Sequence, residues 1–128
     1  MTFSERYQQI WNKGDRELAE KIFDKNISFI FNAISIQDKE TVFSHILERK
    51  TNFNVQYEIS DICTNTHQEL EYHRWNAQAI LQKKFEDFLP TGQKFSYSGL
   101  TLLKIKNDLI SEIVMYSDID EVLKKNKV

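Results

Sequence analysis

The chain has 128 residues, 41% of them hydrophobic and 28% charged, a balance typical of one folded domain with its own core. The net charge is −2 with scattered Lys and Arg, and there is a single cysteine, so neither a nucleic-acid surface nor a disulfide or cysteine-rich metal motif is indicated. No signal peptide and no apolar run approaching the roughly 20 residues of a membrane span are visible, so we expect a cytoplasmic protein without a membrane partner.

Two helices joined by a tight turn are predicted at the start of the chain. Ser4–Lys13 repeats apolar residues at helical spacing. Gly14 suits the left-handed position that ends a helix, and Asp15 suits the N-cap of the next one. The apolar residues between Leu18 and Phe23 form the buried face of this second helix.

The sequence then changes from helix to sheet. Asn26–Phe31 alternates like a strand, and Asp38 suits the N-cap of a third helix that ends at about Lys50. A closing helical turn is expected at Asp120–Lys125. Four further strands are predicted at Val55–Thr64, Glu69–Phe85, Lys94–Lys106 and Leu109–Ser117. Helices followed by a meander predict one α+β domain over residues 1–128, with three N-terminal helices on one face of a curved, mainly antiparallel sheet.

The long strand Glu69–Phe85 is the best place to look for a pocket. Alternate side chains of a strand point to opposite faces, and the odd-numbered side chains here are mostly apolar, so we expect them to point inward. This face holds His73, Trp75, Ala77, Ala79 and Leu81. Two alanines beside a tryptophan leave space for a ligand, unless the phenylalanines of the helices fill it. His73 can orient or protonate a ligand oxygen there, or simply bond to the backbone near the strand end.

The last strand supplies a second group of candidates. One of its faces carries Glu112, Val114, Tyr116 and Asp118. Tyr116 and Asp118 lie where the strand ends. A carboxylate at the rim of an apolar pocket has a pKa raised by desolvation, which suits a general acid or base. The alternative is that Asp118 caps the short terminal helix.

Four motifs lie along the chain: W-N-K-G-D at Trp11–Asp15, Arg74-Trp75, F-E-D-F-L-P-T-G at Phe85–Gly92, and Ser98-Gly99. In this order and spacing they resemble the SnoaL-like polyketide cyclase family of the NTF2-like superfamily. The resemblance runs from about Tyr7 to Leu123. It implies a cone-shaped half-barrel around one apolar pocket, no metal or cofactor, and intramolecular aldol condensation with a pocket Asp at the position of Asp118. It also implies a homodimer, which two apolar faces on the strand Lys94–Lys106 favour independently.

The chain departs from the family pattern in the pocket. Leu81 stands where relatives often carry His, and Tyr116-Ser117 replaces a His-Trp pair. Two functions stay open. One is cofactor-independent acid/base chemistry on an apolar carbonyl compound, an aldol cyclisation or isomerisation, with Asp118 as proton shuttle and His73 or Tyr116 as oxyanion partner. The other is a non-catalytic protein that binds a ligand or assembles through its sheet.

The predicted partner in either case is a small apolar or aromatic ligand and a second copy of the chain, with no nucleic acid. A ligand is expected to contact side chains of the first helix, the long strand and the last strand. These are Trp11, Trp75, Ala77, Ala79, Leu81 and Val114.

Overall fold

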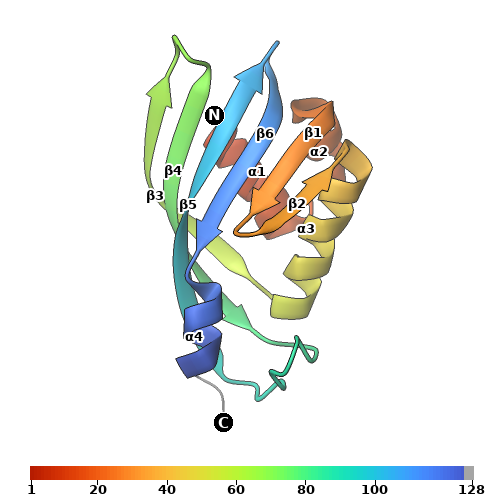
Figure 1. Cartoon of the computed structure of the whole chain (residues 1–128), viewed down its shortest axis with the longest axis vertical. Coiled ribbons are helices and arrows are strands. Elements are labelled where there is room, and N and C mark those ends of the chain that lie inside the picture. Colours follow the sequence, from red (N-terminus) through yellow and green to blue (C-terminus); the bar gives the residue numbers. More distant parts are fainter. Residues whose placement is uncertain (126–128) are drawn as a thin grey trace.

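The computed structural model describes residues 1–125, so the last three residues of the predicted domain lie outside the described part. A strongly curved, unclosed sheet of six strands wraps around the N-terminal helices, and the C-terminal helix lies beyond one end of the sheet (Figure 1). The helices are α1 (Phe3–Lys13), α2 (Arg16–Ile22), α3 (Lys39–Phe53) and α4 (Ile119–Lys125). The strands are β1 (Phe23–Phe31), β2 (Ile34–Gln37), β3 (Gln56–Asn65), β4 (Leu70–Ile80), β5 (Lys94–Lys106) and β6 (Leu109–Ser117). The predicted α+β cone is confirmed.

The N-terminal helices form as their capping residues predict. Thr2 and Glu5 make a reciprocal capping box that starts α1, and Gly14 ends it with φ 62°. The carboxylate of Asp15 accepts a hydrogen bond from the backbone N–H of Leu18 and starts α2. Both helices therefore begin and end within a residue or two of the predicted bounds.

The sheet contains one strand that the sequence analysis did not predict. The order is β2-β1-β6-β5-β4-β3, with β1 parallel to β6 and antiparallel to β2. Asn32 turns the chain with φ 52°, so Ile34–Gln37 folds back along β1. β1 itself starts at Phe23, directly after α2 and three residues earlier than predicted.

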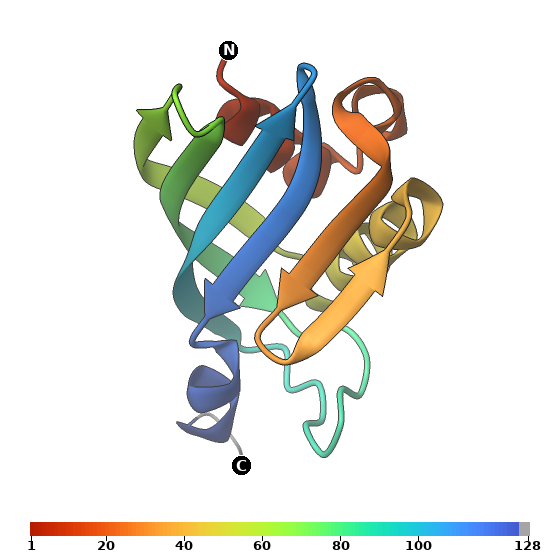
Figure 2. The ribbon, with the colours of Figure 1, turned by 45° about the horizontal axis from the view of Figure 1, so that its top comes forward.

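The predicted strand Glu69–Phe85 is too long. β4 ends at Ile80, and residues 81–93 form a loop below the sheet at the end where α3 finishes (Figure 2). The backbone N–H of Gln82 donates to the carbonyl of Asn52 in α3, and this bond draws the chain out of the sheet. Phe85 and Phe88 then close a tight turn with two mutual backbone hydrogen bonds.

The concave side of the sheet holds the core, together with α1 and α3. The odd-numbered side chains of β4 point inward as predicted, and Trp75 is 2% exposed. On β6 the inward residues are Ile113 and Met115, whereas Val114 and Tyr116 lie on the convex outer face. Val114, predicted to contact a ligand, and Tyr116, predicted as an oxyanion partner, therefore lie on the face turned away from the core, because in β6 the alternation turns the other set of side chains inward.

Candidate functional site

The interior of the cone holds two small cavities, each with about 10 Å³ of free volume, which is room for about one water molecule. Trp11, Tyr57 and Met115 stand between them and line both. We call the first the aromatic chamber; it is lined by Trp11, Phe29, Phe31, His45, Arg49, Phe53, Tyr57, Tyr97, Met115 and Ile119. We call the second the histidine cavity; it is lined by Tyr7, Gln8, Trp11, Tyr57, Ile59, His73, Trp75, Thr101 and Met115.

A pair of tyrosine hydroxyls marks the aromatic chamber. The hydroxyl oxygens of Tyr57 on β3 and Tyr97 on β5 lie 3.3 Å apart. Burial raises the pKa of Tyr97 to about 12, and the pKa of Tyr57 also rises well above its usual value because of burial and the neighbouring Tyr97. Both hydroxyls therefore stay protonated at neutral pH and serve as hydrogen-bond donors rather than bases.

Arg49 of α3 brings a positive charge to the same chamber. Its guanidinium carbon lies 5.2 Å from the ring centres of Phe31 and Phe53 and 4.9 Å from that of Phe85. Within residues 1–125, Nη1 of Arg49 is buried without a hydrogen-bond acceptor. Burial, with the charge of Arg49 as a second cause, lowers the pKa of His45 one helical turn earlier.

The histidine cavity has its polar groups at the start of α1. Nδ1 of His73 lies 2.8 Å from the hydroxyl oxygen of Ser4, and the carboxylate of Glu71 accepts a hydrogen bond from the Ser4 backbone N–H at 2.6 Å. Burial lowers the pKa of His73 to about 4, so the imidazole is neutral at pH 7. The indole N–H of Trp75 donates to Thr101 at 2.9 Å. The contacts of Ser4 hold α1 onto β4, and the bond between Trp75 and Thr101 joins β4 to β5.

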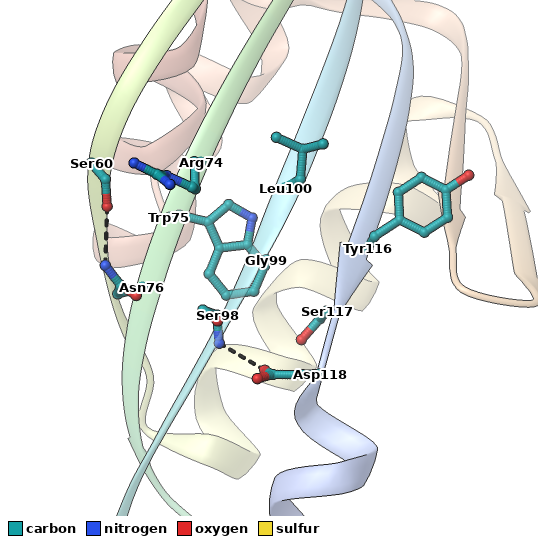
Figure 3. Close-up of a pocket in the computed structure, with 10 residues that line it drawn as sticks. All are labelled: Ser60, Arg74, Trp75, Asn76, Ser98, Gly99, Leu100, Tyr116, Ser117 and Asp118. Carbon is teal, nitrogen blue, oxygen red and sulfur yellow. Dashed lines mark hydrogen bonds between the residues drawn. The ribbon is translucent and has the colours of Figure 1, made fainter.

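A third hollow lies on the convex face of the sheet (Figure 3). We call it the outer groove; it is open, has a volume of about 820 Å³, and is lined by Ser60, Arg74, Trp75, Asn76, Ser98, Gly99, Leu100, Tyr116, Ser117 and Asp118. The side chain of Asp118 points toward β5, where Oδ1 accepts a hydrogen bond from the Ser98 backbone N–H at 2.8 Å. Tyr116 is 58% exposed.

The three predicted acid/base residues do not share one cavity. Asp118 and Tyr116 lie at the outer groove, while His73 lies in the histidine cavity on the opposite side of the sheet. The carbonyl of Asp118 also accepts the first backbone hydrogen bond of α4, from Val122. Asp118 therefore has the helix-starting position of the structural alternative, although its carboxylate bonds to β5.

The predicted ligand-binding residues divide in a similar way. Trp11 lines both cavities, Trp75 lines the histidine cavity and reaches the floor of the outer groove, and Val114 lies on the outer face. Ala77, Ala79 and Leu81 are buried in the core. Their roles toward a ligand stay predictions.

Sequence reasoning missed Arg49 and the tyrosine pair. The spacing of His45, Arg49 and Phe53 at i, i+4 and i+8 places all three on one side of a helix and was the available signal for Arg49. Nothing in the local pattern shows that Tyr57 and Tyr97 meet, because β4 separates their strands in the sheet. Within the described residues, no group of three or more His, Cys, Asp or Glu side chains could hold a metal ion, and no helix is long and apolar enough to cross a membrane.

A curved α+β sheet closed by helices over a small interior places the chain in the class of cone-shaped pocket proteins with the NTF2-like, or ketosteroid isomerase-like, fold. The chain belongs to the SnoaL-like polyketide cyclase family, whose model matches residues 2–125. A comparison with curated proteins finds no significant match.

Solved structures from bacteria share this fold. A candidate polyketide cyclase from Xanthomonas campestris pv. campestris is 12% identical, with a TM-score of 0.84 over 94% of this chain and 91% of that one. IdmH, a candidate polyketide cyclase from Streptomyces antibioticus, is 18% identical, with a TM-score of 0.80 over 96% of each chain. A ketosteroid isomerase-like protein from Catenulispora acidiphila, solved with trimethylamine, is 12% identical, with a TM-score of 0.78 over 94% of this chain and 88% of that one. At these identities the likeness establishes the fold alone.

Proposed function

We propose that the protein binds a small apolar or aromatic carbonyl compound in the aromatic chamber. The observation that carries this proposal is the hydroxyl pair of Tyr57 and Tyr97, which are bonded to each other and keep one O–H for a ligand in a mostly aromatic wall. A ligand oxygen that accepts from this pair has its apolar body surrounded by phenylalanine and tryptophan rings. Such sites typically combine an apolar lining with few polar groups that fix the orientation of the ligand.

The chamber has to open for a ligand, since its free volume is only about 10 Å³. The part of the structure next to the chamber that can move most easily is the loop of residues 81–93. Phe85 of this loop packs edge-on against Phe53 at 5.0 Å, while most other loop residues are exposed. The Phe85 ring is only half-buried, so we infer that its displacement opens the chamber.

The proposal is tested with acetophenone, a one-ring ketone, followed by NMR of the Met115 and Ile119 methyl groups. We expect both signals to shift on titration, and Tyr97→Phe to weaken binding about 2- to 10-fold, the value of one neutral hydrogen bond. Tyr116→Phe, the matched change in the outer groove, leaves the affinity unchanged. Signals that do not move, or shifts confined to the outer groove, would contradict the proposal.

Acid/base chemistry with Asp118 is the second candidate function. Burial is the main cause of the raised pKa of Tyr97, and the charge of Asp118 contributes to it, so the carboxylate lies within electrostatic reach of the chamber. In this scheme Asp118 moves the proton, and Tyr97 is the candidate donor to the enolate oxygen in place of Tyr116 and His73, which do not line the chamber. Proton abstraction is measured by incubating acetophenone with the protein in D₂O. Deuterium that enters the methyl group with the wild-type protein but not with Asp118→Asn supports this function.

We further propose that the protein is a homodimer that pairs through the convex face of the sheet. This face carries exposed apolar side chains on three neighbouring strands: Tyr72, Leu100 and Tyr116 are 37%, 44% and 58% exposed. A contiguous apolar surface of this kind marks an interaction site. The cytoplasmic location expected from the sequence stays a prediction.

A further inference from the structure

We propose that the ligand of the aromatic chamber is an aryl carboxylate whose anionic group pairs with Arg49, an inference that rests on the proposed function. The proposal follows from three features that meet at one end of the chamber. They are a guanidinium whose buried Nη1 has no acceptor, a cluster of phenylalanine rings around it, and a half-buried loop phenylalanine, Phe85, whose ring packs against it.

The charge of Arg49 is uncompensated inside the described structure. The four ion pairs within residues 1–125 use other arginines and lysines, and Nη1 of Arg49 is buried without an acceptor. A buried donor of this kind costs free energy, and more so when it is charged. A planar carboxylate is the group that best matches the two-pronged guanidinium. A ligand that supplies it recovers this cost on binding.

The phenylalanine rings around Arg49 determine which ligand group is favoured next to the carboxylate. Phe31, Phe53 and Phe85 all lie within 5.2 Å of the guanidinium carbon, measured to their ring centres. Arg49 thus contacts aromatic faces and edges on several sides, and a ligand placed against it meets the same rings. An aliphatic acid gains only burial there, whereas an aryl group also gains ring–ring contacts.

Phe85 shows how such a ring fits. It comes from the loop of residues 81–93, lies 4.9 Å from the Arg49 guanidinium and 5.0 Å from the Phe53 ring, and is only half-buried. A phenyl ring on a peripheral loop therefore already occupies one side of the cation. We infer that a ligand ring replaces the Phe85 ring, and that its carboxylate reaches the Nη1 donor that Phe85 leaves without an acceptor.

The tyrosine pair completes the recognition. Arg49 lies close enough for its charge to favour the ionised forms of Tyr57 and Tyr97, although burial outweighs this effect. The two tyrosines and Arg49 also line the same chamber. A carboxylate has two oxygens with about four acceptor positions, enough to bond to Arg49 and to a tyrosine hydroxyl together.

The test compares cinnamate with cinnamamide, which have the same ring and nearly the same shape but differ in charge, by calorimetry and NMR at pH 7. We expect the wild-type protein to bind cinnamate at least about tenfold more tightly than the amide, the least that a hydrogen-bonded charge pair provides. Arg49→Met abolishes this preference, and Arg49→Lys keeps part of it. Phe85→Ala raises the affinity for cinnamate, because the competing ring is gone.

Arg16→Met is the matched control. Arg16 also stacks on a phenylalanine, with its guanidinium carbon 4.6 Å from the Phe43 ring centre, but it lies on the surface and pairs with Glu40. This variant keeps the full preference for cinnamate. Urea denaturation of each variant shows that the loss in Arg49→Met is not a loss of fold, and Arg49→Lys serves if Arg49→Met does not fold.

Two negative results separate this inference from the function on which it rests. Equal affinity of the wild-type protein for cinnamate and cinnamamide, with acetophenone still shifting Met115, overturns the role of Arg49 and leaves the carbonyl-binding chamber intact. Absence of binding by all three compounds, also with Phe85→Ala, overturns the chamber as a ligand site. A preference for cinnamate that survives in Arg49→Met contradicts the inference as well.

Discussion

At the scale of single residues, His73 shows how one pattern is compatible with two roles. Alternation along the strand correctly predicts that its side chain points inward. The pattern cannot show that the imidazole meets Ser4 from the other end of the chain, 69 residues away, in a contact of 2.8 Å. This contact and the low pKa make His73 a neutral, buried group that ties α1 to the sheet. Its partner is a side-chain hydroxyl rather than the backbone group stated as the structural alternative, and its role toward a ligand stays a prediction.

The low pKa of His73 makes stability depend on pH. The folded pKa is about 4, while an unfolded histidine titrates near ~6.5, so the unfolded chain takes up the proton first as pH falls. The contribution of neutral His73 to the free energy of unfolding is complete above pH ~6.5 and is lost progressively toward pH 4. For a pKa shift of this size the loss is roughly 3 kcal/mol. Urea denaturation between pH 7.5 and 4 measures this loss.

Two substitutions make the pH test specific to this residue. His73→Asn keeps a hydrogen-bonding group near Ser4 but does not titrate, so its stability curve flattens between pH 6.5 and 4.5. His67→Asn removes a histidine from an exposed turn and leaves the wild-type slope. A slope that is unchanged in His73→Asn would show that other groups carry the pH dependence.

Gly99 is a second residue whose role depends on packing rather than on the local pattern. It lies opposite Trp75 in the β4–β5 register, and a Cβ atom there would collide with the Trp75 indole and with the Tyr116 backbone carbonyl. Gly99→Ala therefore destabilises the fold by about 1–3 kcal/mol or more, the range for overpacked cores. Ser98→Ala, next along the strand, is nearly neutral because Ser98 bonds to Asp118 through its backbone N–H and carbonyl and not through its side chain. Thermal denaturation of both variants compares them directly, and equal melting temperatures would contradict the steric argument.

At the scale of elements, capping residues predicted the ends of helices better than alternation predicted the lengths of strands. Gly14, Asp15 and Asp38 all fulfil the roles predicted for them, because a cap depends on contacts within three or four residues. The end of β4 depends on a bond between Gln82 and Asn52, which lie 30 positions apart, so alternation alone extended the strand to Phe85. The sequence analysis did not predict β2 for a related reason. Its four residues are too few to show a clear alternation, and the strand is defined by its pairing with β1.

The junction of β6 and α4 yields a prediction about Asp118. Its carboxylate bonds to the Ser98 N–H in β5, so Asp118→Ala leaves this donor to water and lowers the free energy of unfolding by about 1 kcal/mol. Asp118→Asn keeps an acceptor oxygen and costs less. Neither change affects acetophenone binding if Asp118 serves the fold alone. A fall in binding or in deuterium exchange with Asp118→Asn, at unchanged stability, would assign it a chemical role.

At the scale of the whole molecule, motif order and spacing identified the fold, while the interior arrangement needed the structure. Two of the segments that resembled the family, Trp11–Asp15 and Phe85–Gly92, lie at a turn and in a loop, where they redirect the chain. Arg74-Trp75 and Ser98-Gly99 lie inside the neighbouring strands β4 and β5. What the chamber contains depends on which side chains converge from α3, β3 and β5, and no motif connects these elements. The structure was therefore needed to recognise that Tyr57, Tyr97 and Arg49 line one chamber.

The convex face of the sheet gives the last prediction. Tyr72, Leu102, Val114 and Ile30 are aligned in register across four adjacent strands, and Leu100 and Tyr116 form the next row. Six apolar side chains in two rows form a surface that a second copy can cover, and such a continuous patch is costly to leave in water. Light scattering at micromolar concentration should therefore give twice the monomer mass of 15.2 kDa.

Val114→Lys sets a charge at the middle of this patch and should give the monomer without unfolding, since Val114 lies outside the core. Gln78→Lys changes an exposed polar residue of β4 outside the two rows and should leave the dimer intact. A wild-type protein that scatters as a monomer would remove the dimer from the proposal. Monomers from both variants would show that added charge, rather than the apolar rows, controls association.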